Sequence, residues 1–377
     1  MEKRSIYITG TQAIRLHRMA RMDEGVELVA APAARLMPLC PDVRTPQQLE
    51  APELMELLGA GAARPLELLV PNDDSRRWSR GIKTSVVSVP LPSGAFLELG
   101  PGCRRNGNQI VPNGLRVFVE SPAMSIMGAA RTLLSRVARG DMSRLAATFR
   151  VMAFADEYCG FYSRHAVRPY EERIHYDEPG TDSRLTNPVE LQGFLAELHD
   201  VDGALLARLA VRHAIDGSGS PMETCLNHAL TLPPRLAGLS MGKPLANKQL
   251  VADERIWKVL HHGQSLRPDL QWPDEHTLAE YLGGEEHAGK PARIEDKNRM
   301  QDYATAGYAA FPLMYDDVKD QEALARTAQM IARERMRRGA SCELYRVWRL
   351  LRDPGFVARQ RVLMATLLPP VMRYGDG

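Results

Sequence analysis

Two carboxylates, Asp269 and Glu280, have the spacing in this sequence that most clearly points to chemistry. They lie in two short extended runs, 267–272 and 277–282, which the turn residues 273–276 join. If the runs pair as an antiparallel hairpin, residue 269 lies opposite residue 280, and both carboxylates share one side. Like charges placed opposite each other destabilise a bare sheet, and a divalent cation between them removes that cost. Hard oxygen ligands favour Mg²⁺ or Mn²⁺.

The elements around this hairpin predict an α/β unit. Ser220-Pro221-Met222-Glu223 combines an N-cap serine, a proline at the first helical position and a glutamate three residues after the serine, which predicts a helix as far as about residue 232. An extended stretch at 245–251 precedes the two strands of the hairpin. A helix over 292–306 and a strand over 308–314 follow. The predicted order is therefore helix, three strands, helix, strand.

Glu223 has two interpretations. Its carboxylate is either a third ligand beside Asp269 and Glu280 or the glutamate of a capping box, bonded back to Ser220.

The order and the motif residues resemble the PD-(D/E)XK nuclease superfamily, and within it the very-short-patch-repair (Vsr-like) endonuclease branch. The resemblance covers about residues 218–320 and is carried by Pro268-Asp269, Trp272, Glu280-Tyr281, Gly283, His287, Asp296, Arg299, Gly307-Tyr308 and Asp316-Asp317. It implies an α/β fold with a C-terminal restriction-endonuclease-like αβββαβ core. It also implies a Mg²⁺- or Mn²⁺-dependent DNA endonuclease or nickase, in which a metal held by Asp269, Glu280 and Glu223 polarises the scissile phosphate.

The sequence departs from this pattern at Leu282, where the superfamily has lysine and the closer relatives have aspartate. We expect Lys297 or Lys290 to supply the missing positive charge and His287 to carry a proton, with ordinary solvated side chains as the alternative for each. Because Leu282 removes a polar group, a second hypothesis is a catalytically inactive nuclease-fold protein that binds DNA or regulates a toxin–antitoxin or defence system. The region before the core is similar in texture to abortive-infection-type bacterial proteins, which implies phage defence or DNA repair.

Composition is that of a folded protein. The 377 residues are 44% hydrophobic and 25% charged, and the apolar runs are far shorter than the roughly 20 residues that cross a bilayer. The N-terminus has no apolar secretory segment, so we expect a cytoplasmic protein without a membrane span. Five cysteines without CxxC pairing indicate neither a zinc knuckle nor a disulfide framework.

Pattern changes divide the chain into four regions. Residues 1–122 are predicted to be a mixed, β-rich domain with a helix near 11–22 and short strands near 66–70, 83–89, 96–99 and 115–120. Residues 123–215 are predicted to be helical, 218–320 to be the nuclease-like core, and 321–377 to be a basic helical extension. Residues 216–220, rich in glycine and serine, are predicted to be a hinge, and Asp316-Asp317 are expected to cap the last long helix.

Two basic features suit DNA as a partner. Residues 321–377 contain 11 arginines against 5 acidic residues, and the alternative is that Arg333, Arg335, Arg337 and Arg338 form the solvated face of a helix. The second feature is Arg76, Arg77, Arg80 and Lys83, with Trp78 among them. It fits phosphate contacts and base stacking, or an exposed turn between strands. The sequence leaves protein partners and oligomeric state open.

Overall fold

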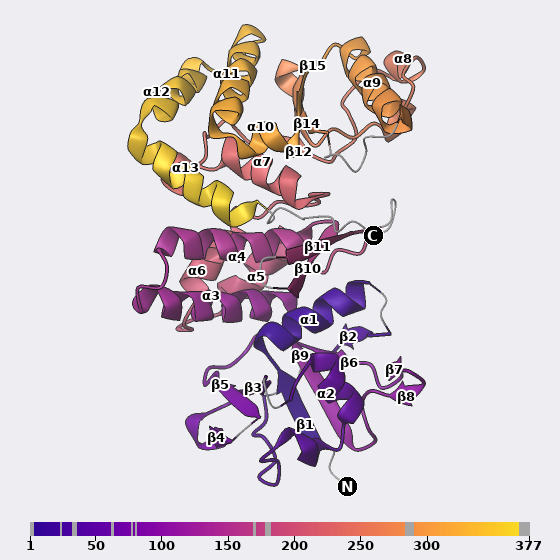
Figure 1. The fold of residues 1–377 in the computed structure, drawn as a ribbon, viewed down its shortest axis with the longest axis vertical. Coiled ribbons are helices and arrows are strands. Elements are labelled where there is room, and N and C mark those ends of the chain that lie inside the picture. Colours follow the sequence, from indigo (N-terminus) through magenta and orange to yellow (C-terminus); the bar gives the residue numbers. More distant parts are fainter. Residues whose placement is uncertain are drawn as a thin grey trace. The chain divides into compact units, whose positions relative to one another are not determined.

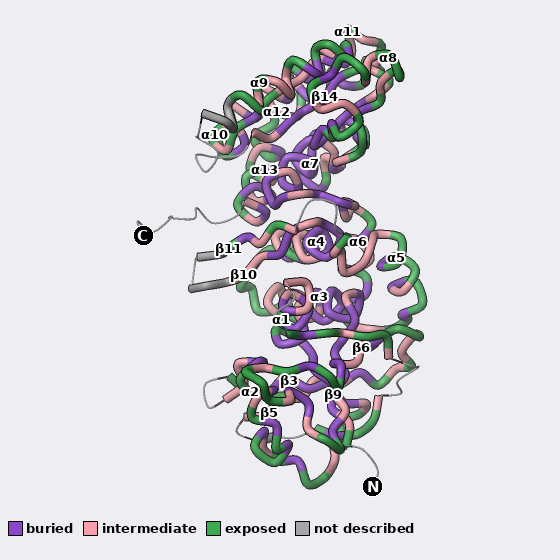
Figure 2. The backbone as a smooth tube through the Cα atoms, turned by 90° about the vertical axis from the view of Figure 1, so that its right-hand side faces the viewer, coloured by how far each residue is buried: buried purple, intermediate pink, exposed green. Residues whose placement is uncertain are grey.

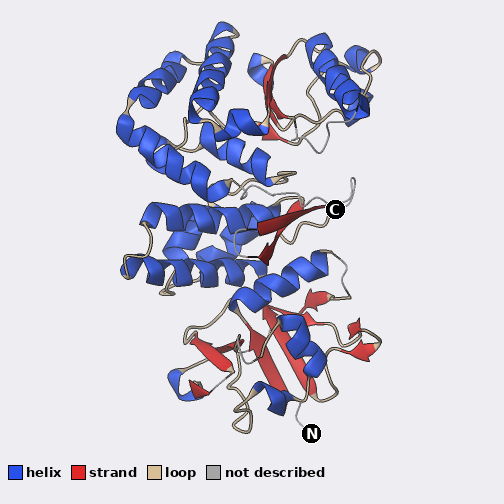
Figure 3. Cartoon of the chain, in the orientation of Figure 1, coloured by secondary structure: helices blue, strands red, loops and turns tan. Residues whose placement is uncertain are grey.

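The chain contains two separate compact units, each built from helices and its own sheet, so the fold class is mixed α/β (Figure 1, Figure 3). The computed structural model describes residues 4–22, 25–31, 36–61, 64–76, 78–79, 81–168, 171–177, 182–282 and 290–368. Unit 1 comprises Met1–Tyr158, Ser163–His165 and Gly180–Ala214, and unit 2 comprises Cys159–Tyr162, Ala166–Pro179 and Ile215–Gly377.

Unit 1 is organised around a mixed sheet in which β1 and β9 are parallel neighbours. Its strand order is β2-β6-β9-β1-β3-β5-β4. The strands are β1 (Arg4–Ile8), β2 (Leu28–Ala30), β3 (Leu66–Val70), β4 (Trp78–Ser79), β5 (Ile82–Val86), β6 (Phe96–Leu99) and β9 (Leu115–Glu120), and β7 (Arg104–Arg105) with β8 (Asn108–Gln109) forms a separate hairpin. The short apolar runs seen in the sequence therefore became strands, with β3, β6 and β9 at the predicted residues.

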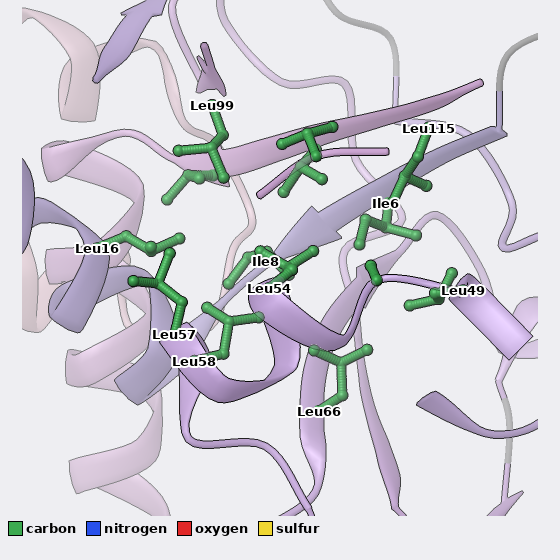
Figure 4. Packing of buried hydrophobic residues seen from close by; sticks show 14 of the residues in the cluster. Ile6, Ile8, Leu16, Leu49, Leu54, Leu57, Leu58, Leu66, Leu99 and Leu115 are labelled. Carbon is green, nitrogen blue, oxygen red and sulfur yellow. The ribbon is translucent and has the colours of Figure 1, made fainter. Parts of the chain in front are cut away.

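Helices cover the sheet of unit 1. Leu16 of α1 (Gly10–Arg21) and Leu54 of α2 (Pro52–Leu58) are buried against Ile6 and Ile8 of β1 (Figure 4). Ser121, followed by proline, caps α3 (Pro122–Ala138) as its residue types predict. Helices α4 (Arg144–Cys159), α5 (Pro188–Glu197) and α6 (Ala204–Val211) follow in the chain.

The stretch predicted to be helical, 123–215, also contains a β-hairpin of β10 (Tyr162–Arg168) and β11 (Glu171–Tyr176). The prediction was wrong here because these residues lack the apolar spacing of a helix, whereas strongly helical sequence precedes and follows them.

Unit 2 has the predicted helix and strands in the predicted order, but a short helix, α8 (Glu254–Trp257), lies between the first two strands, and only residues 245–246 of the predicted stretch 245–251 form a strand. Helix α7 (Pro221–Thr231) is followed by β12 (Leu245–Ala246), α8, β13 (Leu270–Trp272), β14 (Thr277–Tyr281), α9 (Lys290–Thr305) and β15 (Ala309–Leu313). The sheet order is β12-β13-β14-β15; β14 and β15 run parallel, and the other neighbours run antiparallel. Helix α7 is buried along most of its length (Figure 2).

Different helices pack on the two faces of this sheet. On one face, Leu278 of β14 packs with Tyr303 and Ala306 at the end of α9. On the other face, Trp272 of β13 lies under the guanidinium of Arg335, which is 4.5 Å from the centre of the indole ring. Arg335 belongs to α11 (Gln321–Arg337), which α10 (Tyr315–Lys319) precedes and α12 (Arg346–Arg352) and α13 (Pro354–Leu367) follow.

Three expectations for unit 2 need correction. Residues 216–220 are no exposed hinge, because Ser218 and Ser220 are buried and the Ser218 carbonyl accepts a hydrogen bond from the Phe161 amide at 2.7 Å. Asp320 caps α11, since the chain first makes the separate helix α10. Arg335 is buried, so it is not on a solvated face.

Within the described ranges, no helix combines the length and the apolar character that a bilayer crossing requires.

Candidate functional site

The hairpin of unit 2 brings Asp269 and Glu280 together. Strand pairing sets Leu270 beside Ala279 and Trp272 beside Thr277, which confirms the predicted register. Asp269 immediately precedes β13, and its amide donates a hydrogen bond of 3.1 Å to Oε2 of Glu280. Both side chains therefore lie on the face that α9 covers.

Asp269 is buried in a negative environment. Its side chain accepts a hydrogen bond of 2.6 Å from the Tyr281 amide at Oδ2. Burial raises the pKa of Asp269 well above its usual value, and the nearby charge of Glu223 raises it further. The Tyr281 amide and the charge of Arg299 oppose this rise. The carboxyl group consequently holds its proton far more tightly than a solvated aspartate.

Glu223 of α7 joins the same electrostatic cluster. Ser220 caps the helix by accepting from the Glu223 amide at 3.1 Å. The Glu223 carboxylate has three partners here: its Oε2 accepts from the Gly219 amide at 2.8 Å and from Nδ2 of Asn247 at 2.7 Å, and a side-chain hydrogen bond joins the carboxylate to Ser220. A Cβ atom at Gly219 would lie 3.0 Å from Oε1 of Glu223, so a larger residue there would require this carboxylate to shift by a few tenths of an ångström. Burial raises the pKa of Glu223, against these hydrogen bonds and the charge of Arg299.

The positive charge of the site comes from Arg299 of α9. Its Nη2 donates to Oε1 of the buried Glu280 and lies 3.4 Å from the Tyr303 hydroxyl. Its Nε is buried and has no hydrogen-bond partner among the described residues. Sequence reasoning had named Arg299 only as part of the resemblance and had looked elsewhere for the cation. The signal that could have identified it is its helical spacing from Tyr303, four residues later, which packs against Leu278 of the sheet.

The residues predicted to replace the missing lysine do not form this contact. Lys297 is exposed on α9, and no contact between it and the three carboxylates exists in the described part of the chain. His287 and the side chain of Lys290 lie outside the described residues. Leu282 follows β14, where its amide donates to the Leu313 carbonyl at 2.8 Å. Strand alternation places its apolar side chain on the same face as Glu280.

The donor set suits a hard divalent cation. Among the described residues, the cluster holds three carboxylates and one guanidinium, which together carry two negative charges in excess when fully ionised. As the side chains stand, no group of three or more His, Cys, Asp or Glu residues in the described ranges is arranged to hold an ion. Glu280 is held by Arg299, and this ion pair would have to open for the cation to take that carboxylate.

The residues predicted to contact DNA lie in unit 1. Arg76 pairs with Asp73 at 2.7 Å, and Lys83 pairs with Glu67 at 2.8 Å. Arg77 and Arg80 are outside the described residues. Arg76 and Lys83 are therefore ion-paired on the surface.

Comparison with known proteins gives relatives but no function. The chain is 30% identical over 149 residues to two Mycobacterium tuberculosis proteins, the uncharacterized protein MT2308 of strain CDC 1551 / Oshkosh and the uncharacterized protein Rv2248 of strain H37Rv. Each match covers 39% of this chain and 50% of the relative, so the chain spans about half the length of these relatives. No family model matches the chain, and no solved structure matches it.

Proposed function

We propose that unit 2 is a metal-dependent nuclease of the PD-(D/E)XK type that hydrolyses DNA phosphodiester bonds as an endonuclease or nickase. The observation that supports this most is the cluster of three carboxylates near the Arg299 guanidinium, which α7, β14 and the residue before β13 contribute as Glu223, Glu280 and Asp269. The element order and the hairpin register of unit 2 are those expected of such a core.

The charge balance of the cluster favours a cation. Buried carboxylates without counter-charges are costly, and the raised pKa values of Asp269 and Glu223 express that cost. If these side chains had only a structural role, neutral side chains of similar size would fill it at a lower free-energy cost. Excess negative charge that is retained in a buried site is a common mark of a functional site.

Mg²⁺ or Mn²⁺ would be held by Asp269, Glu280 and Glu223, where it would polarise the phosphate and lower the pKa of a water molecule. The protein itself contributes the guanidinium of Arg299 to the metal site. Arg299, released from Glu280, has the planar donor fork that matches phosphate oxygens. Asn247 and the Gly219 amide keep the Glu223 carboxylate oriented through their hydrogen bonds.

A plasmid-nicking assay tests this proposal. Supercoiled DNA is incubated with the full chain and Mg²⁺ or Mn²⁺, with EDTA as a control, and wild type is compared with Asp269→Asn and with Asp274→Asn, an exposed aspartate of the hairpin turn. We expect nicking that requires metal, disappears with Asp269→Asn and persists with Asp274→Asn. Equal nicking by wild type and Asp269→Asn would exclude this site as its source. Phage plating on cells that express the same variants then tests a role in defence.

A second function is favoured by two observations, the ion pair between Arg299 and Glu280 and the apolar Leu282 beside them. Under this alternative, a nuclease-like fold would keep the Arg299 guanidinium in place of the metal, in a protein that binds DNA or regulates a partner. This function predicts salt-dependent DNA binding that Asp269→Asn leaves unchanged and no cleavage of supercoiled, mismatched or single-stranded DNA.

A further inference from the structure

A second polar cluster ties α9 to the loop that begins at His261. The buried carboxylate of Asp302 accepts hydrogen bonds at 2.9 Å from the amides of both His261 and His262. It is also 2.8 Å from Nδ1 of His261 and 2.7 Å from Nδ1 of His262. Four contacts on one carboxylate fix the end of α9 to this loop.

His262 makes a second connection to the same helix. Its Nε2 lies 2.6 Å from Oε1 of Glu295, earlier on α9. A ring that donates from both nitrogens to two carboxylates is a protonated imidazole. Among the described residues, the titratable groups in contact with the His262 ring are Asp302 and Glu295 of α9, and His261 shares the Asp302 carboxylate with it.

The cluster surrounds the position of Arg299. Glu295, Arg299 and Asp302 are separated by four and three residues, so they lie along one face of α9. The loop therefore holds the helix both before and after the residue that reaches Glu280. We propose that His262 and Asp302 are positioning residues, which fix α9 so that Arg299 stays at the acidic cluster and which release it when His262 loses its proton. The importance of this for catalysis rests on the proposed function.

The pH range in which His262 and Asp302 fix α9 follows from the titrations of these two residues. Burial opposes ionisation of His262, but the hydrogen bonds to Asp302 and Glu295 outweigh it and raise its pKa. This contribution is complete below the unfolded pKa of about 6.5 and is lost as pH rises through the higher folded value. Burial likewise opposes ionisation of Asp302, yet its hydrogen bonds lower its pKa to about 2, so its contribution is lost only in acid.

Hydrogen–deuterium exchange of the full chain tests the inference without metal or DNA. Exchange of α9 amides is measured between pH 5.5 and 9 and corrected for the intrinsic pH dependence. For wild type we expect opening of α9 to increase roughly tenfold across this range, the loss expected for a charge-assisted hydrogen bond. In the His262→Gln variant, the α9 amides should exchange at every pH as fast as those of wild type do at high pH. The control variant His199→Gln, at an exposed histidine of unit 1, should behave as wild type.

A wild-type α9 whose protection does not change with pH would overturn the proposal, and this comparison needs no variant to fold. Failure of the proposed function is a separate result. If the protein never nicks DNA but α9 opens as pH rises, His262 and Asp302 fix α9 as proposed, and only the link to catalysis is lost. If the protein nicks DNA but the exchange of α9 does not depend on pH, the proposed function holds and the positioning role of His262 and Asp302 is excluded.

Discussion

At the scale of single residues, the candidate site buries carboxylates whose negative charge makes burial unfavourable. Asp269 is 7% exposed and Glu280 is 1% exposed, and Asp269 lies near the charge of Glu223. One guanidinium cannot neutralise three carboxylates. Without a metal, such a site should cost stability, and that cost can be measured.

Asp269→Asn should stabilise the metal-free protein at neutral pH. The amide keeps an oxygen for the Tyr281 amide and removes the repulsion by Glu223. Because the folded pKa of Asp269 is raised, wild-type stability falls as pH rises from about 3.8 to the folded value, and the gain in the variant should be about 1 kcal/mol above that range. Urea unfolding in EDTA measures it. A loss of stability at pH 7 would instead make the carboxylate a structural acceptor.

Arg299→Gln should destabilise the metal-free protein, because it leaves Glu280 buried without its cation. We expect about 2 kcal/mol, below the usual cost of breaking a fully buried pair, since the Arg299 side chain is 31% exposed. Lys297→Gln, on the exposed side of the same helix, is the control and should change little. Saturating Mn²⁺ should reduce the Arg299→Gln deficit, and a deficit that Mn²⁺ does not alter would separate Arg299 from the metal site.

At the scale of elements, the correct predictions came from short-range rules. The proline after Ser220 and the tight turn at 273–276 set α7 and the register of β13 with β14. Two of the errors had long-range causes. The buried state of Ser218 depends on Phe161 and Thr224, and the place of Arg335 depends on Trp272, so no local pattern could reveal them. For Arg299 the helical spacing to Tyr303 was a local signal, and only its contact with Glu280 is long-range.

The capping of α11 gives a test at this scale. The Asp320 carboxylate accepts from the Ala323 amide at 2.7 Å, so Asp320→Ala should lower the free energy of unfolding by about 1 kcal/mol. Asp316→Ala, at the residue that the sequence had suggested as the cap, should cost less than about 0.5 kcal/mol. The reverse order in urea unfolding would mean that α10 and α11 act as one helix.

At the scale of the whole molecule, unit 2 is discontinuous in sequence. Its segment 159–162 supplies the Phe161 amide to Ser218 and the Tyr162 hydroxyl, which lies 3.1 Å from Oγ1 of Thr224. A fragment of residues 215–377 lacks these partners, so we expect it to unfold at lower temperature than the same residues in the full chain, and residues 216–220 to resist limited proteolysis of the intact protein. Early cleavage within 216–220 would contradict this packing.

The acidic cluster as a divalent-cation site is the central claim, and Mn²⁺ binding followed by electron paramagnetic resonance tests it most directly. Wild type and Asp274→Asn should bind Mn²⁺ at a single strong site, and Asp269→Asn should weaken that site at least about tenfold. Mg²⁺ should displace the bound Mn²⁺. Equal Mn²⁺ affinity in wild type and Asp269→Asn, or no bound Mn²⁺ in either, would contradict the claim and leave Arg299 as the cation of this cluster.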